Sequence, residues 1–167
     1  MHDTIYSHIH CHILFNYYGN TEWQNNIPLS PKLCTYVTFK NEYEAEPYVK
    51  KFLTRKQRSV IAQLRSGTLP LQIETGRFQN IPLEYRLCLL CNSNNVETET
   101  HFLFECECYN DLRQQFYGNS ENLYPEFALN PDENKLKMMM TTEMIKLTAQ
   151  FICNCFNKRQ SIIFHAT

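Results

Sequence analysis

Four residues between positions 88 and 106 have the types and the spacing of a metal site. Cys88 and Cys91 form a Cys-x2-Cys pair, His101 follows, and Cys106 ends the segment CLLCNSNNVETETHFLFEC. Zinc prefers four tetrahedral ligands of nitrogen and sulfur type, and a short Cys-x2-Cys turn supplies two of them at little entropic cost. The spacing therefore predicts one structural Zn²⁺ in a zinc-knuckle-like Cys-Cys-His-Cys site.

The chemistry expected of this site is structural rather than catalytic. Because protein side chains would fill all four positions, none remains to activate a water molecule. Cys108 follows closely and could compete with Cys106 as the fourth ligand. The alternative is that these cysteines are free buried thiols and His101 is a core histidine. Four ligand residues with chelating spacing in so short a segment favour the metal.

The segment that must position these ligands is expected to be a turn followed by a helix. The polar residues 92–95 lead to Thr98, which together with neighbouring glutamates is typical of a helix start. His101 would then lie on the first turns, and Cys106 could reach the same ion if the helix relaxes at its end. The apolar residues 102–104 would hold this helix against the core.

Two further helices are expected before this segment. The first places Tyr48, Phe52 and Leu53 on one face, and the second is capped by Thr54 and stopped by Gly67.

The rest of the chain is also mainly helical by pattern. A β-branched and aromatic run at residues 34–39 predicts one short strand. Residues 109–116 continue a helix that Gly118 is expected to end. Residues 135–164 are expected to form one amphipathic helix, whose wide apolar stripe most simply packs on the core. The fold class predicted is mainly α with a small β element.

The length of 167 residues suits one compact domain with an extension. We expect a poorly ordered arm over residues 1–30, a zinc-binding domain with a basic helix over 31–120, and a loop with the amphipathic helix over 121–167. The N-terminus lacks the features of a secretory signal, and no apolar run approaches the roughly 18 residues of a membrane span. These features predict an intracellular protein, in the nucleus or cytoplasm, that is neither secreted nor membrane-bound.

The net charge of −1 does not indicate a class of binding partner. The positively charged residues are, however, concentrated between Val49 and Phe78. Arg55, Arg58 and Arg65 would share one stripe of the helix after Thr54, and a line of guanidinium groups suits a phosphate backbone. An ordinary solvated helix face is the competing interpretation. The candidate nucleic-acid contacts are Lys50, Lys51, Arg55, Lys56, Arg58, Arg65 and, more weakly, Arg77.

The residues that an enzyme would need are not recognisable. Asp3, Asp111 and Asp132 are the aspartates of the chain, and they do not form the paired-aspartate motif of a two-metal polymerase site. The sequence also contains no glycine-rich phosphate loop and no Gly-x-Ser-x-Gly elbow. We therefore expect a protein without catalytic activity.

Three stretches, residues 31–49, 58–78 and 86–113, resemble the C-terminal region of reverse transcriptases from non-LTR (LINE-type) retrotransposons. The last holds the family's Cys-x2-Cys, Glu-x-x-His-Phe-Leu and Cys-x2-Tyr-x3-Arg features. The matching residues are Cys88, Cys91, Glu99 or Glu97, His101, Phe102, Leu103, Cys106, Tyr109 and Arg113. The spacing to Tyr109 makes Cys106, rather than Cys108, the match to the family's fourth ligand.

The resemblance implies a zinc-binding module that contacts RNA or DNA. The polymerase palm and endonuclease domain of the family are missing, so the chain is similar to a detached tail or truncated copy, and no polymerase activity is carried over. Cys34 stands where the family would have a basic residue. Two alternatives remain open: an assembly module that binds a parent polymerase or a second copy through residues 135–167, and a transposon remnant without function.

Overall fold

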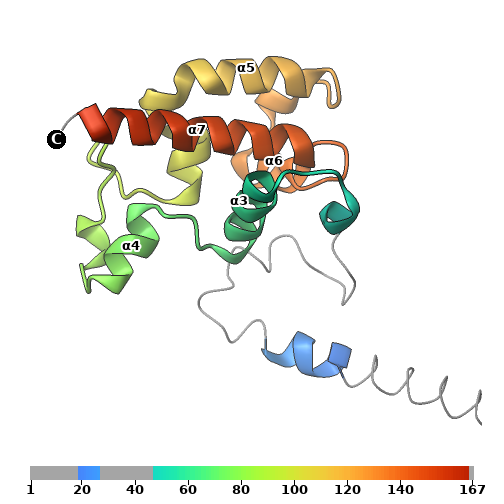
Figure 1. Ribbon diagram of the computed structural model, residues 1–167, viewed down its shortest axis with the longest axis horizontal. Coiled ribbons are helices and arrows are strands. Elements are labelled where there is room, and N and C mark those ends of the chain that lie inside the picture. Colours follow the sequence, from blue (N-terminus) through green and yellow to red (C-terminus); the bar gives the residue numbers. More distant parts are fainter. Residues whose placement is uncertain (1–18, 27–46, 166–167) are drawn as a thin grey trace, which may run out of the picture.

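The computed structural model of the chain describes residues 19–26 and 47–165 (Figure 1). After a short helix over residues 19–26, the elements in chain order are η2 (Pro47–Lys50), α3 (Arg55–Ser66), α4 (Gln72–Phe78), η3 (Leu83–Tyr85), η4 (His101–Glu105), η5 (Glu107–Tyr109), α5 (Asn110–Glu121), η6 (Phe127–Leu129), α6 (Asp132–Met139) and α7 (Ile145–His165). The β structure found among the described residues is an isolated antiparallel bridge between Leu87 and Val96. The predicted mainly α fold with a small β element is confirmed, and the strand expected at 34–39 lies outside the described residues.

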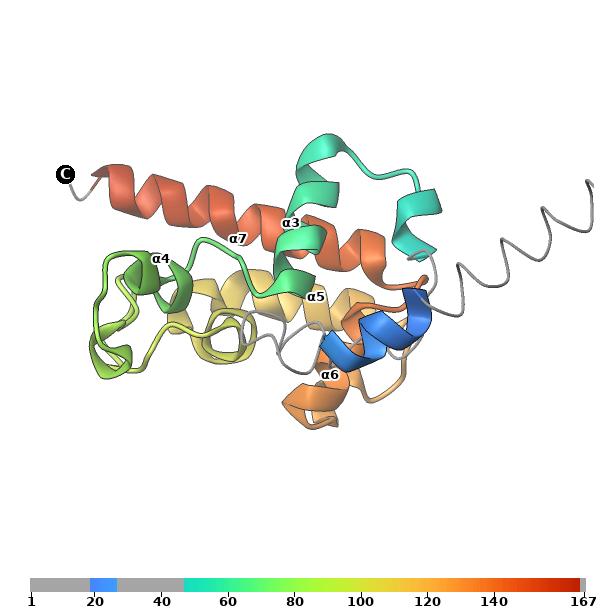
Figure 2. The same ribbon diagram turned by 90° about the horizontal axis from the view of Figure 1, so that it is seen from below.

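Helix α7 is the centre of the fold. It packs against both α3 and α5, which lie on different sides of it (Figures 1 and 2). Ile145, Ile152 and Cys155 on its inner face are fully or almost fully buried. They join one core that contains residues from both predicted ranges, 31–120 and 121–167. The apolar stripe predicted for the last segment is therefore used for packing within the chain.

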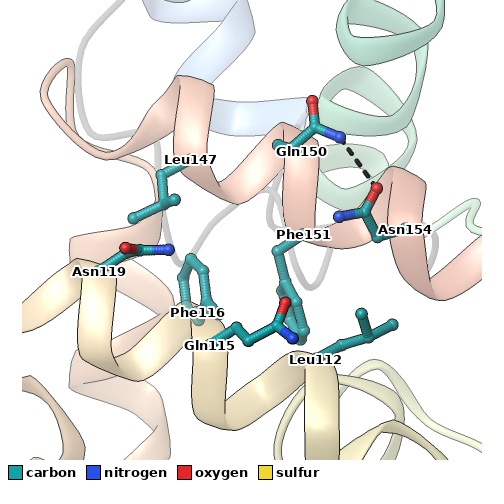
Figure 3. Close-up of a pocket in the computed structure, with 8 residues that line it drawn as sticks. All are labelled: Leu112, Gln115, Phe116, Asn119, Leu147, Gln150, Phe151 and Asn154. Atoms are coloured by element: carbon teal, nitrogen blue, oxygen red, sulfur yellow. Dashed lines mark hydrogen bonds between the residues drawn. The ribbon is translucent and has the colours of Figure 1, made fainter.

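The contact between α5 and α7 repeats one pattern of residue types. Each helix contributes a leucine, a glutamine, a phenylalanine and an asparagine at the same spacing. They are Leu112, Gln115, Phe116 and Asn119 on α5, and Leu147, Gln150, Phe151 and Asn154 on α7. Because the helices run antiparallel, Leu112 lies near Asn154 and Asn119 near Leu147 (Figure 3). The rings of Phe116 and Phe151 stack at 4.6 Å beneath the groove that these residues line.

The ends of α3 follow the prediction from sequence. The Thr54 hydroxyl accepts a hydrogen bond from the Gln57 backbone N–H at 3.2 Å, and the Gln57 side chain accepts one from the Thr54 N–H at 2.9 Å. This capping box satisfies backbone donors that a helix start leaves without partners. Gly67 ends the helix in the left-handed conformation at φ 65°, which glycine adopts without a steric penalty.

Three predicted boundaries are wrong. The first predicted helix is reduced to the single turn η2, so Leu53 is buried but the Phe52 side chain is fully exposed. Helix α5 continues through Gly118 to Glu121, because Gly118 lies at an open surface position and one glycine costs a helix only about 1 kcal/mol. Residues 19–26, assigned to a loosely held arm, form a helix.

The predicted C-terminal helix is divided into α6 and α7. Two threonine hydroxyls donate hydrogen bonds to the last carbonyls of α6: Thr141 to Met138 at 2.8 Å, and Thr148 to Met139 at 2.7 Å. These bonds satisfy carbonyls that a continuous helix would have paired internally. Helix α4 was not predicted from the sequence. No helix in the described part of the chain combines the length and apolarity that a membrane span requires.

Candidate metal centre

The four predicted ligand residues come together in space. Their ligand atoms all lie within 4.8 Å of one another. Cys88 Sγ is 3.9 Å from Cys106 Sγ, and Cys91 Sγ is 3.3 Å from His101 Nε2. Metal bonds of about 2.0–2.3 Å in a tetrahedral site would separate ligand atoms by roughly 3.3–3.8 Å. The group could therefore hold a metal ion without a large rearrangement.

Cys108 is not one of the converging ligands. Its thiol donates a hydrogen bond to the Leu90 carbonyl at 2.7 Å, which turns the sulfur toward the backbone. Cys106, by contrast, is buried beside Cys88. The choice between the two cysteines, open at the level of spacing, is settled in favour of Cys106.

A π-helical turn brings His101 and Cys106 to the same side. In an α-helix, a step of five residues would rotate a side chain by about 140° away from the first. Here η4 is a π-helix, and the Cys106 N–H donates to the His101 carbonyl at 2.7 Å. The wider turn realigns the two side chains. This is the physical form of the relaxation expected at the end of that helix, and such turns are frequent at functional sites.

The first two ligands lie on a small hairpin. The Cys88 N–H donates to the Asn95 carbonyl at 3.0 Å, and the Glu97 N–H donates to the Arg86 carbonyl at 2.9 Å. Asn94 turns the chain with a positive φ of 55°, a conformation that asparagine tolerates better than most residues. These bonds hold together the hairpin that carries the Cys-x2-Cys turn.

Hydrogen bonds and burial act differently on the thiols. Burial raises the pKa of Cys88 and of Cys106. Burial also opposes ionisation of Cys91, but hydrogen bonds from the Ser93 side chain and backbone, with contributions from Cys88 and His101, lower its pKa to about 7. Since the thiolate is the ligand form, Cys91 is the thiol most ready to bind a metal at neutral pH.

His101 is oriented by a carboxylate on its other ring nitrogen. Its Nε2 faces Cys91, while its Nδ1 lies 3.3 Å from Glu105 Oε2. The imidazole is buried, and the contact with Glu105 gives its second ring nitrogen a polar partner. A carboxylate behind a ligating histidine fixes the orientation and the tautomer of the ring.

Two residues named through the family resemblance support the site from behind. The buried Arg113 guanidinium donates to the Leu103 carbonyl at 2.9 Å and to the Cys106 carbonyl at 2.8 Å. Both carbonyls belong to the end of the π-helical turn. Tyr109 packs edge-on against Phe102, with ring centroids 5.1 Å apart. Arg113 and Tyr109 therefore hold the ligand-bearing turn in place.

One contact of this centre, the buried pair of Glu97 and Arg159, was not predicted from the sequence. Glu97 is fully buried, and its carboxylate pairs with the Arg159 guanidinium of α7 through both oxygens. Glu97 Oε1 also lies 3.6 Å from Cys88 Sγ. A signal for it exists in the sequence: Arg159 lies four residues after the buried Cys155, on the apolar face of α7. A charge on such a face requires a buried partner.

Most of the cations predicted to contact nucleic acid are exposed. However, Arg55, Arg58 and Arg65 do not form the expected line of charges along α3, because Arg65 is buried. Lys50, Lys51, Arg55, Lys56 and Arg58 lie at the surface.

Arg65 and Arg77 are placed differently. Arg65 is only 5% exposed, and its guanidinium lies over the Tyr48 ring at 5.7 Å from the centroid. Arg77 makes two hydrogen bonds to Glu74, at 2.8 and 2.7 Å. The prediction that Arg65 shares an exposed face with Arg55 and Arg58 is therefore wrong, because its side chain turns onto the core.

A surface hollow between α3 and α7 is bordered by two of the exposed cations. Arg55 and Lys56 lie on its rim, and the Lys56 ammonium donates to the Asn157 side chain at 2.6 Å. The remaining lining residues are apolar or uncharged hydrogen-bonding groups: Ser59, Val60, Gln63, Pro70, Phe156 and Gln160. The hollow thus combines positive charge with an apolar surface.

Comparisons with known proteins give no match: no protein-family model, no curated protein and no solved structure matches this chain. The resemblance to retrotransposon reverse transcriptases stays a prediction, and the site has to be interpreted from its own geometry.

Proposed function

We propose that the chain is a zinc-stabilised nucleic-acid-binding module without catalytic activity of its own, derived from the C-terminal region of a retrotransposon reverse transcriptase. The observation that carries the binding function is the hollow between α3 and α7, where Arg55 and Lys56 border an apolar surface. The partner is RNA or DNA, with a parent polymerase as a further partner.

Zinc is the ion that the donor set favours. Three sulfurs and one imidazole nitrogen in a tetrahedral arrangement are the donors of structural zinc sites, whereas magnesium and calcium prefer oxygen. Cys88 and Cys106 are buried, so the bound ion would be shielded from solvent on that side. All four positions would be occupied by protein, which suits a structural ion. Reduced thiols also suit an intracellular compartment, the nucleus or cytoplasm.

The hollow fits the chemistry of a nucleotide chain. Phosphates would lie against Arg55 and Lys56, and a base or sugar would cover Val60 and Phe156. Arg58 is exposed on the same helix, and Lys50 and Lys51 precede it, so that a longer strand could meet further cations. This arrangement favours affinity for the backbone over recognition of particular bases.

The test is fluorescence anisotropy with labelled single-stranded RNA and DNA of the same sequence, measured with zinc-loaded protein over a series of salt concentrations. The variant R55Q/R58Q removes two exposed charges from α3. The matched control, K137Q/K146Q, removes two exposed charges elsewhere. We expect the first variant to weaken binding to every sequence and to lower the slope of log Kd against log salt by about 1.4, since each phosphate contact to a single strand contributes about 0.7. Equal binding by both variants, or no binding at low salt, would contradict the proposal.

A further inference from the structure

A buried carboxylate lies between the metal group and the central helix. Glu97 has no exposed surface, and its Oε1 is 3.6 Å from Cys88 Sγ. Its Oε2 accepts a hydrogen bond from the Gln72 N–H, at the start of α4, at 2.8 Å. From α7, Arg159 donates to both carboxylate oxygens, with Nη2 at 3.0 Å from Oε2. Residues 62 positions apart in the sequence therefore meet directly behind a ligand.

We propose that Arg159 is a positioning residue of the metal centre and that binding of the ion and packing of α7 are thermodynamically coupled through the Arg159–Glu97 pair. The inference rests on the metal site of the proposed function. It goes beyond that function because it assigns the centre a dependence on a helix that contributes no ligand.

The balance of charges is the first argument. A divalent ion bound by three thiolates and a neutral imidazole carries one net negative charge, and the Glu97 carboxylate adds a second at 3.6 Å from Cys88 Sγ. Glu97 and Cys88 are buried, so water screens the interaction between this carboxylate and this ligand only weakly. The Arg159 guanidinium is itself buried and neutralises one of these two negative charges. Without Arg159, an unpaired carboxylate would oppose a centre that is already negative.

The geometry of α7 is the second argument. Phe156, one turn before Arg159, packs against Phe102 with ring centroids 5.1 Å apart. Phe102 follows His101 directly in the π-helical turn. Helix α7 thus touches both halves of the centre: Arg159 supports the hairpin that carries Cys88, and Phe156 supports the turn that carries His101. Undocking of α7 would release both halves together.

A neighbouring residue on the same helix provides a matched control. Lys158 pairs with Asp111 of α5 at 2.6 Å, and the Asp111 side chain is exposed. This pair also ties α7 to the rest of the molecule, but it contacts none of the four ligands. A general loss of α7 packing would affect both variants, whereas a specific electrostatic role would affect only Arg159.

The experiment replaces the native ion with Co²⁺, whose thiolate and tetrahedral absorption bands report directly on the centre. Affinities come from competition with a chromophoric chelator, for the wild type and for R159M, E97Q/R159M and K158M. We expect R159M to weaken Co²⁺ binding by about 10- to 100-fold, as is usual for groups behind metal ligands. The double variant should recover most of this loss because the unpaired carboxylate is gone, and K158M should bind like the wild type.

A measurement on the unaltered chain covers the case in which R159M does not fold. Amide hydrogen exchange of the wild type, with and without a chelator, should show faster exchange in the second half of α7 after the ion is removed. Unchanged exchange there would overturn the coupling. So would R159M with wild-type affinity, or a double variant no better than R159M. A wild type that gives no tetrahedral Co²⁺ spectrum would instead overturn the metal site itself, and the coupling with it.

Discussion

The metal group and the basic helix α3 are built in opposite ways. The ligand-bearing segment is held by buried contacts from several elements: Arg113 behind the π-helical turn, and Arg159 behind the hairpin. Three cations of α3, Arg55, Lys56 and Arg58, are exposed at its surface, whereas Arg65 of the same helix is buried. Damage to the first region should therefore change the stability of the fold, whereas damage to the second should change binding and leave the fold intact.

The largest effect should follow from loss of a ligand. Cys106→Ser should abolish tight metal binding and lower the free energy of unfolding by several kcal/mol, because metal-binding free energy at such a site is folding free energy. Thermal unfolding with and without a chelator measures this. Cys108→Ser is the control, since its sulfur faces the Leu90 carbonyl, and it should melt like the wild type. A chelator that leaves the wild-type melting temperature unchanged would refute the structural role of the metal.

Loss of a support behind the ligands should have the next largest effect. Arg113→Met would remove the guanidinium donor from the buried Leu103 carbonyl and leave the Cys106 carbonyl with the Tyr109 N–H as its donor, at a cost of about 2–4 kcal/mol. Urea unfolding of the metal-loaded protein measures this cost. Arg77→Met removes a surface arginine that contacts Glu74 and the Phe78 ring, so it should cost much less than Arg113→Met, because solvent screens the pair. Similar costs for the two variants would mean that Arg113 does not support the turn.

The start of α3 should show a smaller effect, separable from binding. Thr54→Ala removes the hydroxyl that accepts from the Gln57 N–H, and should destabilise the protein by about 1 kcal/mol. Thr54→Ser keeps the acceptor and should recover most of this loss. At low temperature, where both variants remain folded, RNA affinity should stay at the wild-type value. A variant that loses affinity while folded would indicate that the cap itself contacts the nucleic acid.

The smallest effect should come from the exposed ion pair between α7 and α5. Asp111→Asn should cost only a few tenths of a kcal/mol, because solvent and salt screen the Lys158 pair. The difference from the wild type should disappear at high salt. A double-mutant cycle of Asp111 and Lys158, compared with one of Glu97 and Arg159, contrasts an exposed pair with a buried one. A larger coupling in the exposed pair would contradict the distinction between the two regions.

The features that could be predicted from the sequence are those whose determinants lie close together in the chain. The four metal ligands fall within 19 residues, and the caps of α3 depend on Thr54, Gln57 and Gly67 alone. Hydrophobic spacing likewise placed the buried face of α7, although not the break before it. In each case, hydrogen bonds or side-chain periodicity within a few turns suffice to define the structure.

The remaining features depend on contacts between distant segments. Whether Arg65 is exposed depends on where Tyr48 lies, and the role of Glu97 depends on Arg159 at the far end of the chain. The family resemblance favoured Cys106 over Cys108, but how Cys106 reaches the other ligands depends on the path of the backbone through the π-helical turn. The spacing of residues along a helix predicts which side chains share a face, but it does not predict which other segment packs against that face. The free energy of a buried charge is set by its partner, and that partner is known only once the helices have packed.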